Sequence, residues 1–480
     1  MSKQLFNSSE KSNFILNMTE EKYSQLASYG LSLMCFTTAV FAVIPEFIDK
    51  LSYSIVSGGL AVSGVICMIL ALIGIMKKYI DFRNLSLWGF VFMIIWGIIS
   101  LINSYSVSVS FYGFSGRGEG LLAIIFYAGF FITAMSVRHE KAVNIIINSI
   151  IASGLLHSIV GLVQVFTGKL SHYQYASITT KINASSGLAQ SPVFLAMVLS
   201  LVLTASLVTA VLTDNKKRRI FSIISACLCS FVMMFTYSLM GITGIITALL
   251  LSAGAGIFIK KTPKIRLLAL FSGILPAIIA VIIVNAGIIG NISSYRLYDG
   301  HTIWWADSYM RLSASGNCSP DNLNLSDTVE VYKYLNNKTV DIIKKYSLTG
   351  TGEDQLVYPQ LYTNGGLDPE TADISDIIAL NINTFDKVYN EYLYTAGTRG
   401  IPSLIALVLI LCSVLTAGLR KMKKSPSENT VCTFMMFVCG IIIFFIGCSN
   451  ITFSPVFWTV SGLLMSSCSE KSNLLLTKKA

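Results

Sequence analysis

The sequence predicts an all-α integral membrane protein with about twelve transmembrane helices. Of its 480 residues, 53% are hydrophobic and only 12% are charged, and the mean hydropathy is +0.66. A soluble domain of this size is less apolar. The apolar residues also fall in runs of about 20, the length that a helix needs to cross a bilayer core. Finally, Lys and Arg gather in alternate connections between these runs, as in multi-pass membrane proteins.

The candidate spans follow one another closely, except before the tenth. They cover 25–46, 53–76, 86–104, 120–136, 142–166, 187–212, 220–238, 239–259, 267–287, 396–419, 429–448 and 453–468. The apolar run 220–259 would be about 60 Å long as one helix, roughly twice the core thickness. We therefore expect two helices there, joined at the turn FTYSLMGITG, Phe235–Gly244.

The charges predict the orientation of these spans. With the N- and C-termini cytoplasmic, the inner segments carry 23 of the 35 Lys and Arg residues, which obeys the positive-inside rule. Membrane topology thus accounts for the net charge of +10, and we expect no nucleic-acid partner. The first 24 residues are polar, so we expect the first span, rather than a cleavable signal peptide, to direct insertion.

One outer connection is long enough to form a domain. We expect a membrane domain over 1–287 with spans 1–9, an extracytoplasmic loop domain over 288–392, and a second membrane part over 393–480 with spans 10–12. The loop holds fourteen Asp and Glu and seven Lys and Arg, without an apolar run long enough to cross. We expect it to be mainly helical, with helices at 302–312 and 329–345 and a last helix leading into the tenth span. Long loops on a rigid scaffold usually carry function.

Signatures of metal or nucleotide chemistry are missing from the sequence. The cysteines lie almost all in apolar runs, which predicts neither disulfides nor a metal site. The histidines have no partners at ligand spacing, and HExxH, GxSxG, P-loop and nucleotide-binding GxGxxG motifs do not occur. We therefore expect no metal and no cofactor.

Charged side chains instead gather at the outer mouths of the spans. Residues of this kind are Arg117 and Glu119 before the fourth span, Arg296, His301 and Arg311 beside Trp304 and Trp305 in the long loop, and Lys387, Glu391 and Arg399 at the tenth span. If these mouths converge, they form a cationic pocket with one or two carboxylates. The guanidinium fork of Arg suits the oxygens of a lipid diphosphate. In the alternative interpretation, Arg117 pairs with Glu119 or anchors the chain at the membrane interface, and Arg399 is also an interface anchor. The tryptophans then only form an aromatic belt.

Several of these segments together carry a resemblance to a known family. They are GRGEGLL (Gly116–Leu122), GLAQSPVFLA (Gly187–Ala196), the turn FTYSLMGITG, TIWWADS and LTGTGEDQL in the long loop, and YNEYLYTAGTRGIPSL (Tyr389–Leu404). In this order, and with the long loop before the tenth span, the chain resembles the O-antigen ligase/polymerase family over most of its length. These polytopic bacterial membrane proteins join glycans carried on undecaprenyl diphosphate outside the cytoplasmic membrane.

The resemblance implies metal-independent glycosyl transfer at the outer face of a bacterial cytoplasmic membrane. The substrate would be an undecaprenyl diphosphate-linked oligosaccharide, with membrane lipid and possible glycan-assembly proteins as further partners. Arg117 would be the first diphosphate contact, with Arg296, Arg311 and Arg399 as further candidates. Glu391, Glu119 and Tyr389 are the catalytic candidates, and His301, Trp304, Trp305 and Asn390 the candidates for glycan binding. A general base must lie within hydrogen-bond reach of the acceptor hydroxyl.

The chain departs from the family pattern at three basic positions. Tyr389 stands where the family has a histidine before Asn-x-Tyr-Leu, Ser238–Gly241 lacks the arginine of a Ser-Arg-Gly turn, and His301 follows Gly300 where the family has arginine. The loss of these ligase-like residues favours a repeat-unit polymerase. A ligase with the same layout, a transporter or flippase for lipid-linked glycans, and a catalytically silent member that binds glycan or partners are the alternatives.

Overall fold

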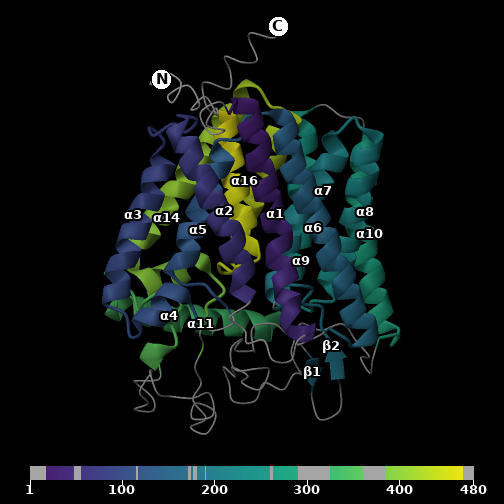
Figure 1. Cartoon of the computed structure of the whole chain (residues 1–480). Helices are drawn as coiled ribbons and strands as arrows, with labels where there is room; N and C mark the ends of the chain where they lie inside the picture. Colours follow the sequence, from purple (N-terminus) through teal and green to yellow (C-terminus); the bar gives the residue numbers. More distant parts are fainter. Residues whose placement is uncertain are drawn as a thin grey trace, which may run out of the picture.

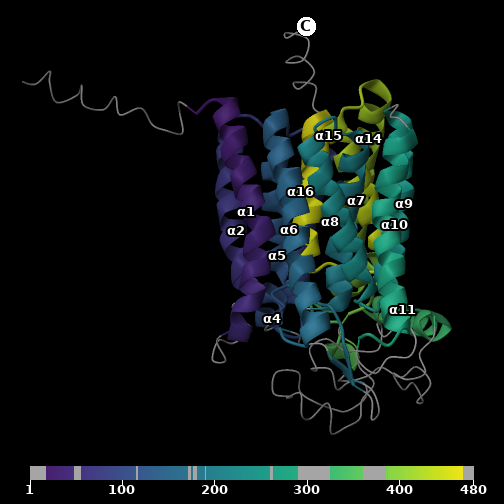
Figure 2. The same ribbon diagram turned by 90° about the vertical axis from the view of Figure 1, so that its right-hand side faces the viewer.

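The computed structural model forms one bundle of long helices that run up and down beside one another (Figures 1 and 2). It describes residues 18–47, 56–114, 117–170, 174–176, 181–189, 191–259, 263–289, 325–360, 385 and 387–468. The described helices are α1 (Glu20–Phe47), α2 (Val56–Met76), α3 (Leu85–Ile102), α4 (Val107–Tyr112), α5 (Leu121–Met135), α6 (Glu140–Thr167), α7 (Pro192–Leu212), α8 (Lys216–Met234), α9 (Leu239–Phe258), α10 (Pro263–Asn285), α11 (Leu325–Lys345), α14 (Glu391–Lys424), α15 (Glu428–Ile443) and α16 (Phe453–Cys468). Strands β1 (Gln174–Ala176) and β2 (Lys181–Asn183) form an antiparallel pair in which Tyr175 lies opposite Ile182.

The chain is an α-helical membrane protein. Among the described residues, seven helices are long and apolar enough to cross a bilayer: α2, α3, α6, α7, α9, α10 and α14. Three shorter apolar helices, α5, α15 and α16, stand among them in the bundle. Many large side chains of α3 and α10 are exposed although they are apolar, for example Phe92 and Phe271. Exposed apolar surface of this kind fits contact with lipid.

A helix lies over each of the twelve apolar runs that the sequence singles out. The run 220–259 does divide, because α8 ends at Met234 and α9 begins at Leu239. The side chain of Ser238 caps α9 by accepting a hydrogen bond from the amide of Gly241. The expected start of the sixth span at Gly187 is wrong, since Gly187 has φ +54° in a loop and α7 begins at Pro192.

The long loop is described in part. The expected helix at 329–345 is confirmed as α11, whereas the expected helix at 302–312 lies outside the described residues. The sequence did not predict the short helix α4 or the hairpin β1–β2. Helix α4 and strands β1 and β2 lie at the same end of the bundle, the lower end in Figure 1.

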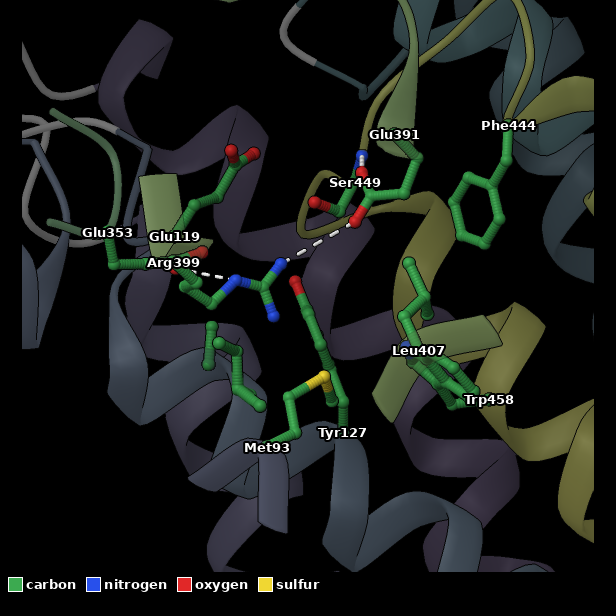
Figure 3. A pocket seen from close by; sticks show the side chains of 12 residues that line it. Met93, Glu119, Tyr127, Glu353, Glu391, Arg399, Leu407, Phe444, Ser449 and Trp458 are labelled. Atoms are coloured by element: carbon green, nitrogen blue, oxygen red, sulfur yellow. Dashed lines mark hydrogen bonds and ion pairs between the residues drawn. The ribbon is translucent and has the colours of Figure 1, made fainter. Parts of the chain in front are cut away.

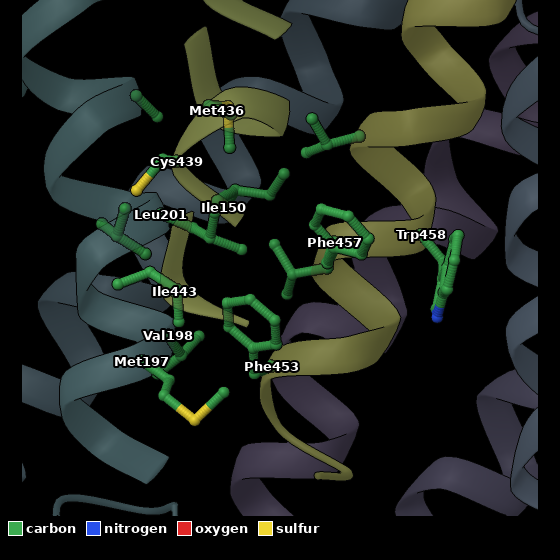
Figure 4. Packing of buried hydrophobic residues seen from close by; sticks show 14 of the residues in the cluster. Ile150, Met197, Val198, Leu201, Met436, Cys439, Ile443, Phe453, Phe457 and Trp458 are labelled. Carbon is green, nitrogen blue, oxygen red and sulfur yellow. The ribbon is translucent and has the colours of Figure 1, made fainter. Parts of the chain in front are cut away.

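Helix α7 forms the centre of the bundle, and every one of its residues is buried. Its side chains Met197, Val198 and Leu201 face Ile443 of α15 and Phe453 of α16 (Figure 4). Ser200 and Thr204 on α7 each donate to the carbonyl four residues earlier in the helix, and Ser206 donates to Ser225 of α8. A helix apolar on all sides is buried on all sides, as expected for such a pattern.

Helix α14 is interrupted near its N-terminal end, at the end of the bundle where α4 and α11 lie. Gly400 has φ +81° and ψ +168°, which interrupts the helix before Pro402. The segment that follows, 401–424, is about 36 Å long and can cross a bilayer core by itself. The segment that precedes the break carries Glu391, Tyr394, Thr395 and Arg399, and all four side chains are buried.

Candidate functional site

Seven ionisable side chains that lie far apart in the sequence meet at this end of the bundle. They are Arg117 and Glu119 between α4 and α5, Glu353 and Asp354 after α11, Lys387 before α14, and Glu391 and Arg399 on α14, and each is at most 6% exposed. Charged groups are almost never buried unless they are paired. Their pairing therefore defines the site.

Arg117 and Asp354 form the most deeply buried pair. Nη2 of Arg117 lies 2.9 Å from Oδ1 of Asp354, and both side chains are fully buried. Asp354 also accepts hydrogen bonds from the hydroxyl of Tyr394 at 3.1 Å and from the amide of Phe114 at 2.8 Å. The guanidinium of Arg117 lies 5.0 Å from the centre of the Phe114 ring. The pair thus links the α4–α5 connection to the loop after α11.

Lys387 pairs with Glu119 beside this contact. Its ammonium group donates to Oε2 of Glu119 and to the carbonyl of Ser449. It also lies 5.1 Å from the ring centre of Tyr394, within the range of a cation–π contact. The other carboxylate oxygen of Glu119, Oε1, makes no hydrogen bond with the described residues.

Arg399 lies between two carboxylates. Its Nε is 2.8 Å from Oε2 of Glu353, and its Nη2 is 3.7 Å from Oε1 of Glu391. Nη2 also donates to the hydroxyl of Thr395, which in turn donates to Glu391. The second oxygen of Glu391 accepts the amide of Ser449 at 2.5 Å. Both oxygens of Glu391 are therefore occupied by donors.

The loop after α11 reaches the break in α14 because glycines let the two backbones touch. The amides of Thr351 and Gly352 donate to the carbonyls of Gly397 and Thr398, and the amide of Ile401 donates to Ser347. These bonds satisfy groups that the helix break leaves open.

Glycine is required where the loop after α11 crosses the break in α14. Gly350 has φ +69°, and a Cβ there would lie 2.3 Å from the carbonyl carbon of Thr398. A Cβ on Gly400 would lie 1.9 Å from the carbonyl oxygen of Leu348. Asp354, four residues after Gly350, has φ +59°, a conformation that few residues other than glycine adopt. The sequence TGTGED therefore places two acidic side chains against α14.

A small cavity lies among the charged groups. It is lined by Glu119, Glu353, Glu391, Arg399 and Ser449 together with the apolar and aromatic side chains Met93, Ala123, Ile124, Tyr127, Leu407, Phe444 and Trp458. Figure 3 shows the hydroxyl of Tyr127 directed at the guanidinium of Arg399. The free volume is about 20 Å³, which is room for a water molecule but not for a sugar. The arrangement of the described residues is thus a closed one.

Burial shifts the proton affinity of the carboxyl groups in the loops. It raises the pKa of Glu353 to about 7, although Arg399 acts in the opposite direction. Burial likewise raises the pKa of Glu119, against the effect of Lys387. Burial lowers the pKa of Lys387, but Glu119, Cys448 and Asp354 together outweigh this effect and raise the pKa above its usual value. Carboxyl groups with a pKa near neutrality are frequent at functional sites.

The structure brings only part of the expected site together. Arg399, Glu119 and Glu391 line the cavity. Arg117 belongs to the cluster but is not among the cavity residues.

Tyr389 stacks on Tyr332 of α11, with 5.1 Å between the ring centres, and is likewise not among the residues that line the cavity. The side chain of Asn390 caps α14 by accepting the amides of Tyr392 and Leu393. The remaining predicted site residues lie outside the described residues: Arg296, His301, Trp304, Trp305 and Arg311.

The described part of the cluster holds three cations and four carboxylates, where the sequence predicts a cationic pocket with one or two carboxylates. Arg296, His301 and Arg311, which that prediction includes, lie outside the described residues. Sequence reasoning did not assign a role to Glu353 or Asp354. The signal was present as an acidic pair directly after two glycines in LTGTGEDQL, a pattern that fits a tight loop presenting charges.

No protein-family model matches the chain, and no curated protein matches it in sequence.

Proposed function

We propose that this chain is a metal-independent membrane glycosyltransferase that polymerises oligosaccharide repeat units carried on undecaprenyl diphosphate. It acts at the outer face of a bacterial cytoplasmic membrane, within glycan assembly for the cell envelope. The observation that carries the proposal is the cavity that Arg399, Glu119 and Glu353 line together at one end of a membrane bundle. This site combines a cation for a diphosphate with carboxylates for an acceptor hydroxyl, and the family resemblance of the sequence points to the same chemistry.

The proposed topology has twelve spans with both termini in the cytoplasm. Basic residues at the opposite end of the bundle support this orientation, among them Lys216–Arg219 at the start of α8 and Lys421–Lys424 at the end of α14. The positive-inside rule assigns that end to the cytoplasm. The charged cavity then faces outward, at the depth where the head group of a lipid-linked glycan lies.

Four residues of the cluster take roles that their contacts support. Arg399 neutralises the diphosphate as the bond between the anomeric carbon and the leaving oxygen breaks. Glu119 accepts the proton of the attacking acceptor hydroxyl, since its Oε1 makes no hydrogen bond with the described residues and burial raises its pKa. Glu391 holds Arg399 and the α15–α16 connection in place. Arg117, paired with Asp354, supports the site rather than touching the substrate.

Deletion of the gene in its host tests the proposal. Loss of long chains, with accumulation of single repeat units on the lipid carrier, is the expected result. Long chains that accumulate on the lipid but are missing from their final acceptor would indicate the ligase instead. A normal glycan profile would contradict both transfer reactions.

A second candidate function is transport of a lipid-linked glycan, and the break in α14 at Gly400 favours it. Transporters often bind their substrates at discontinuous helices, although near the middle of the bilayer. Here the break lies toward one end of α14, after about nine of its 34 residues. Proteoliposomes with a fluorescent lipid-linked sugar separate the two functions, because a transporter moves the label between leaflets while a polymerase lengthens the glycan.

A further inference from the structure

The charge balance of the cluster sets a condition on binding a diphosphate. The described groups comprise three cations and four carboxylates, so the cluster carries a formal excess of one negative charge when all are ionised. A diphosphate adds at least two more negative charges in a buried environment, where unpaired charge is strongly unfavourable. Among the described groups, this added charge is offset when a carboxylate leaves its cation and becomes protonated.

Geometry singles out Glu353 among the carboxylates. It lines the cavity, and its Oε2 lies 2.8 Å from Nε of Arg399, the arginine that also lines the cavity. Glu353 thus occupies an edge of the guanidinium that an anion would use. Glu391 contacts Arg399 at a longer distance of 3.7 Å, and both of its oxygens accept other donors. Asp354 is held by Arg117 and Tyr394, away from the cavity lining.

The surroundings of Glu353 disfavour its charge. Arg399 from α14 stabilises the carboxylate, and Lys387 does so more weakly, whereas burial, Glu391 and Asp354 act against it. Tyr127 from α5 and Tyr394 from α14 also interact with its charge, and Glu119 lies on the same cavity. The result is a pKa of about 7, so a proton can be taken up near neutral pH at little cost.

We propose that Glu353 occupies the anion site of Arg399 in the empty protein, and that a prenyl diphosphate displaces it with uptake of one proton by its carboxyl group. This inference rests on the proposed function and adds a condition to it. The proton that enters remains on Glu353 as a neutral carboxyl, and Arg399 exchanges one anion for another. Binding then weakens as pH rises above about 7, by about tenfold per pH unit, because the competent protonated form becomes rarer.

Calorimetric titration of the purified full-length protein with geranyl diphosphate tests this, at pH 6 to 8 and in buffers of different ionisation enthalpy. The wild type should take up one proton more per bound ligand at pH 8 than Glu353→Gln does. The phosphate groups of the ligand contribute equally to both proteins, so the difference reports Glu353. Glu353→Gln should bind about tenfold more tightly than the wild type at pH 8 and equally at pH 6. Glu428→Gln, at the opposite end of the bundle, is the matched control and should behave like the wild type.

The outcomes separate the two proposals. Binding by the wild type whose affinity is independent of pH, or proton uptake that Glu353→Gln retains in full, overturns the role of Glu353 and leaves the proposed function standing. Absence of binding by the wild type at every pH overturns both. If Glu353→Gln does not fold, Glu353→Ala replaces it in the same two comparisons, because this variant also lacks the titrating carboxyl group.

Discussion

The buried pair of Arg117 and Asp354 illustrates how single residues hold this site together. Replacing Arg117 by Met leaves the charge of Asp354 without its closest cation in a fully buried position. We expect a loss of about 3–5 kcal/mol in unfolding free energy, the usual cost of breaking a buried pair on one side. Thermal unfolding in detergent, together with protein abundance in membranes, measures this effect.

The double variant Arg117→Met/Asp354→Asn is the matched control. It removes both charges and should recover most of the lost stability, because a neutral pair of similar volume costs little. If Arg117→Met alone is as stable as the wild type yet abolishes glycan extension, Arg117 acts on substrate after all. That outcome would restore the role that the sequence resemblance implies for it.

The carboxyl group of Glu353 makes stability depend on pH. Its pKa is raised from 4.5 to about 7 in the folded protein, so the folded state holds the proton more tightly than the unfolded state. Its contribution to stability is therefore complete below about pH 4.5 and is lost as pH rises through about 7.

Glu353→Gln removes this loss of unfolding free energy, which amounts to about 3 kcal/mol at most. It should unfold at a higher temperature than the wild type at pH 8 and at a similar temperature at pH 5. A constant difference across this range would contradict the assignment.

At this scale the sequence revealed the residue types but not their partners. Arg399, Glu119 and Glu391 stand out as charges at the mouths of apolar runs, and all three line the cavity. Which carboxylate each cation meets depends on how the loop after α11 folds back on α14. For this reason the sequence assigned no role to Glu353 and Asp354, although LTGTGEDQL is among the segments that carry the family resemblance.

The crossing of the loop over the break in α14 is the element that builds the cavity. Gly400→Ala places a methyl group against the carbonyl oxygen of Leu348 at a positive φ. We expect this substitution to separate the loop from α14 and to cost more than 2 kcal/mol, because both strain and lost hydrogen bonds contribute. Limited proteolysis of the loop and thermal unfolding would measure this loss of stability.

Gly254→Ala in α9 is the control, since a Cβ there meets nothing within 4 Å and helix propensity favours alanine. Equal stability of the two variants would show that the crossing is not needed.

Prediction of the elements succeeded where long apolar runs decide the structure. The division of 220–259 followed from the length of the run and its turn-prone middle, and Ser238 provides the cap that the turn needs. The break at Gly400 was not predicted, because a glycine before a proline also fits the entry of a regular helix. Its cause is tertiary: the loop after α11 supplies the hydrogen bonds that make an interrupted helix stable here.

The whole molecule separates its charges between two ends. One end carries short basic connections, in which ion pairs such as Arg218–Glu428 join the helix starts. The other carries the buried cluster, α4 and α11. The positive-inside rule relates this division to the membrane. An even number of crossings between Lys217 and Lys423 is required for both to lie on the cytoplasmic side.

Accessibility of introduced cysteines tests this arrangement directly. Lys345 at the end of α11, Lys217 at the start of α8 and Lys423 near the end of α14 are all exposed, so cysteine at these positions reacts wherever a reagent can reach. In a Cys318→Ser/Cys468→Ser background, we expect a membrane-impermeant maleimide to label Lys345→Cys in intact spheroplasts. Lys217→Cys and Lys423→Cys should react only after the membrane is permeabilised. The background protein without an added cysteine measures labelling of the remaining cysteines.

Labelling of Lys217→Cys and Lys423→Cys on opposite sides would require an odd number of crossings between them and would exclude the twelve-span topology. Labelling of Lys345→Cys only from the cytoplasm would place the charged cavity on the inner side, where a polymerase of exported glycan chains has no substrate.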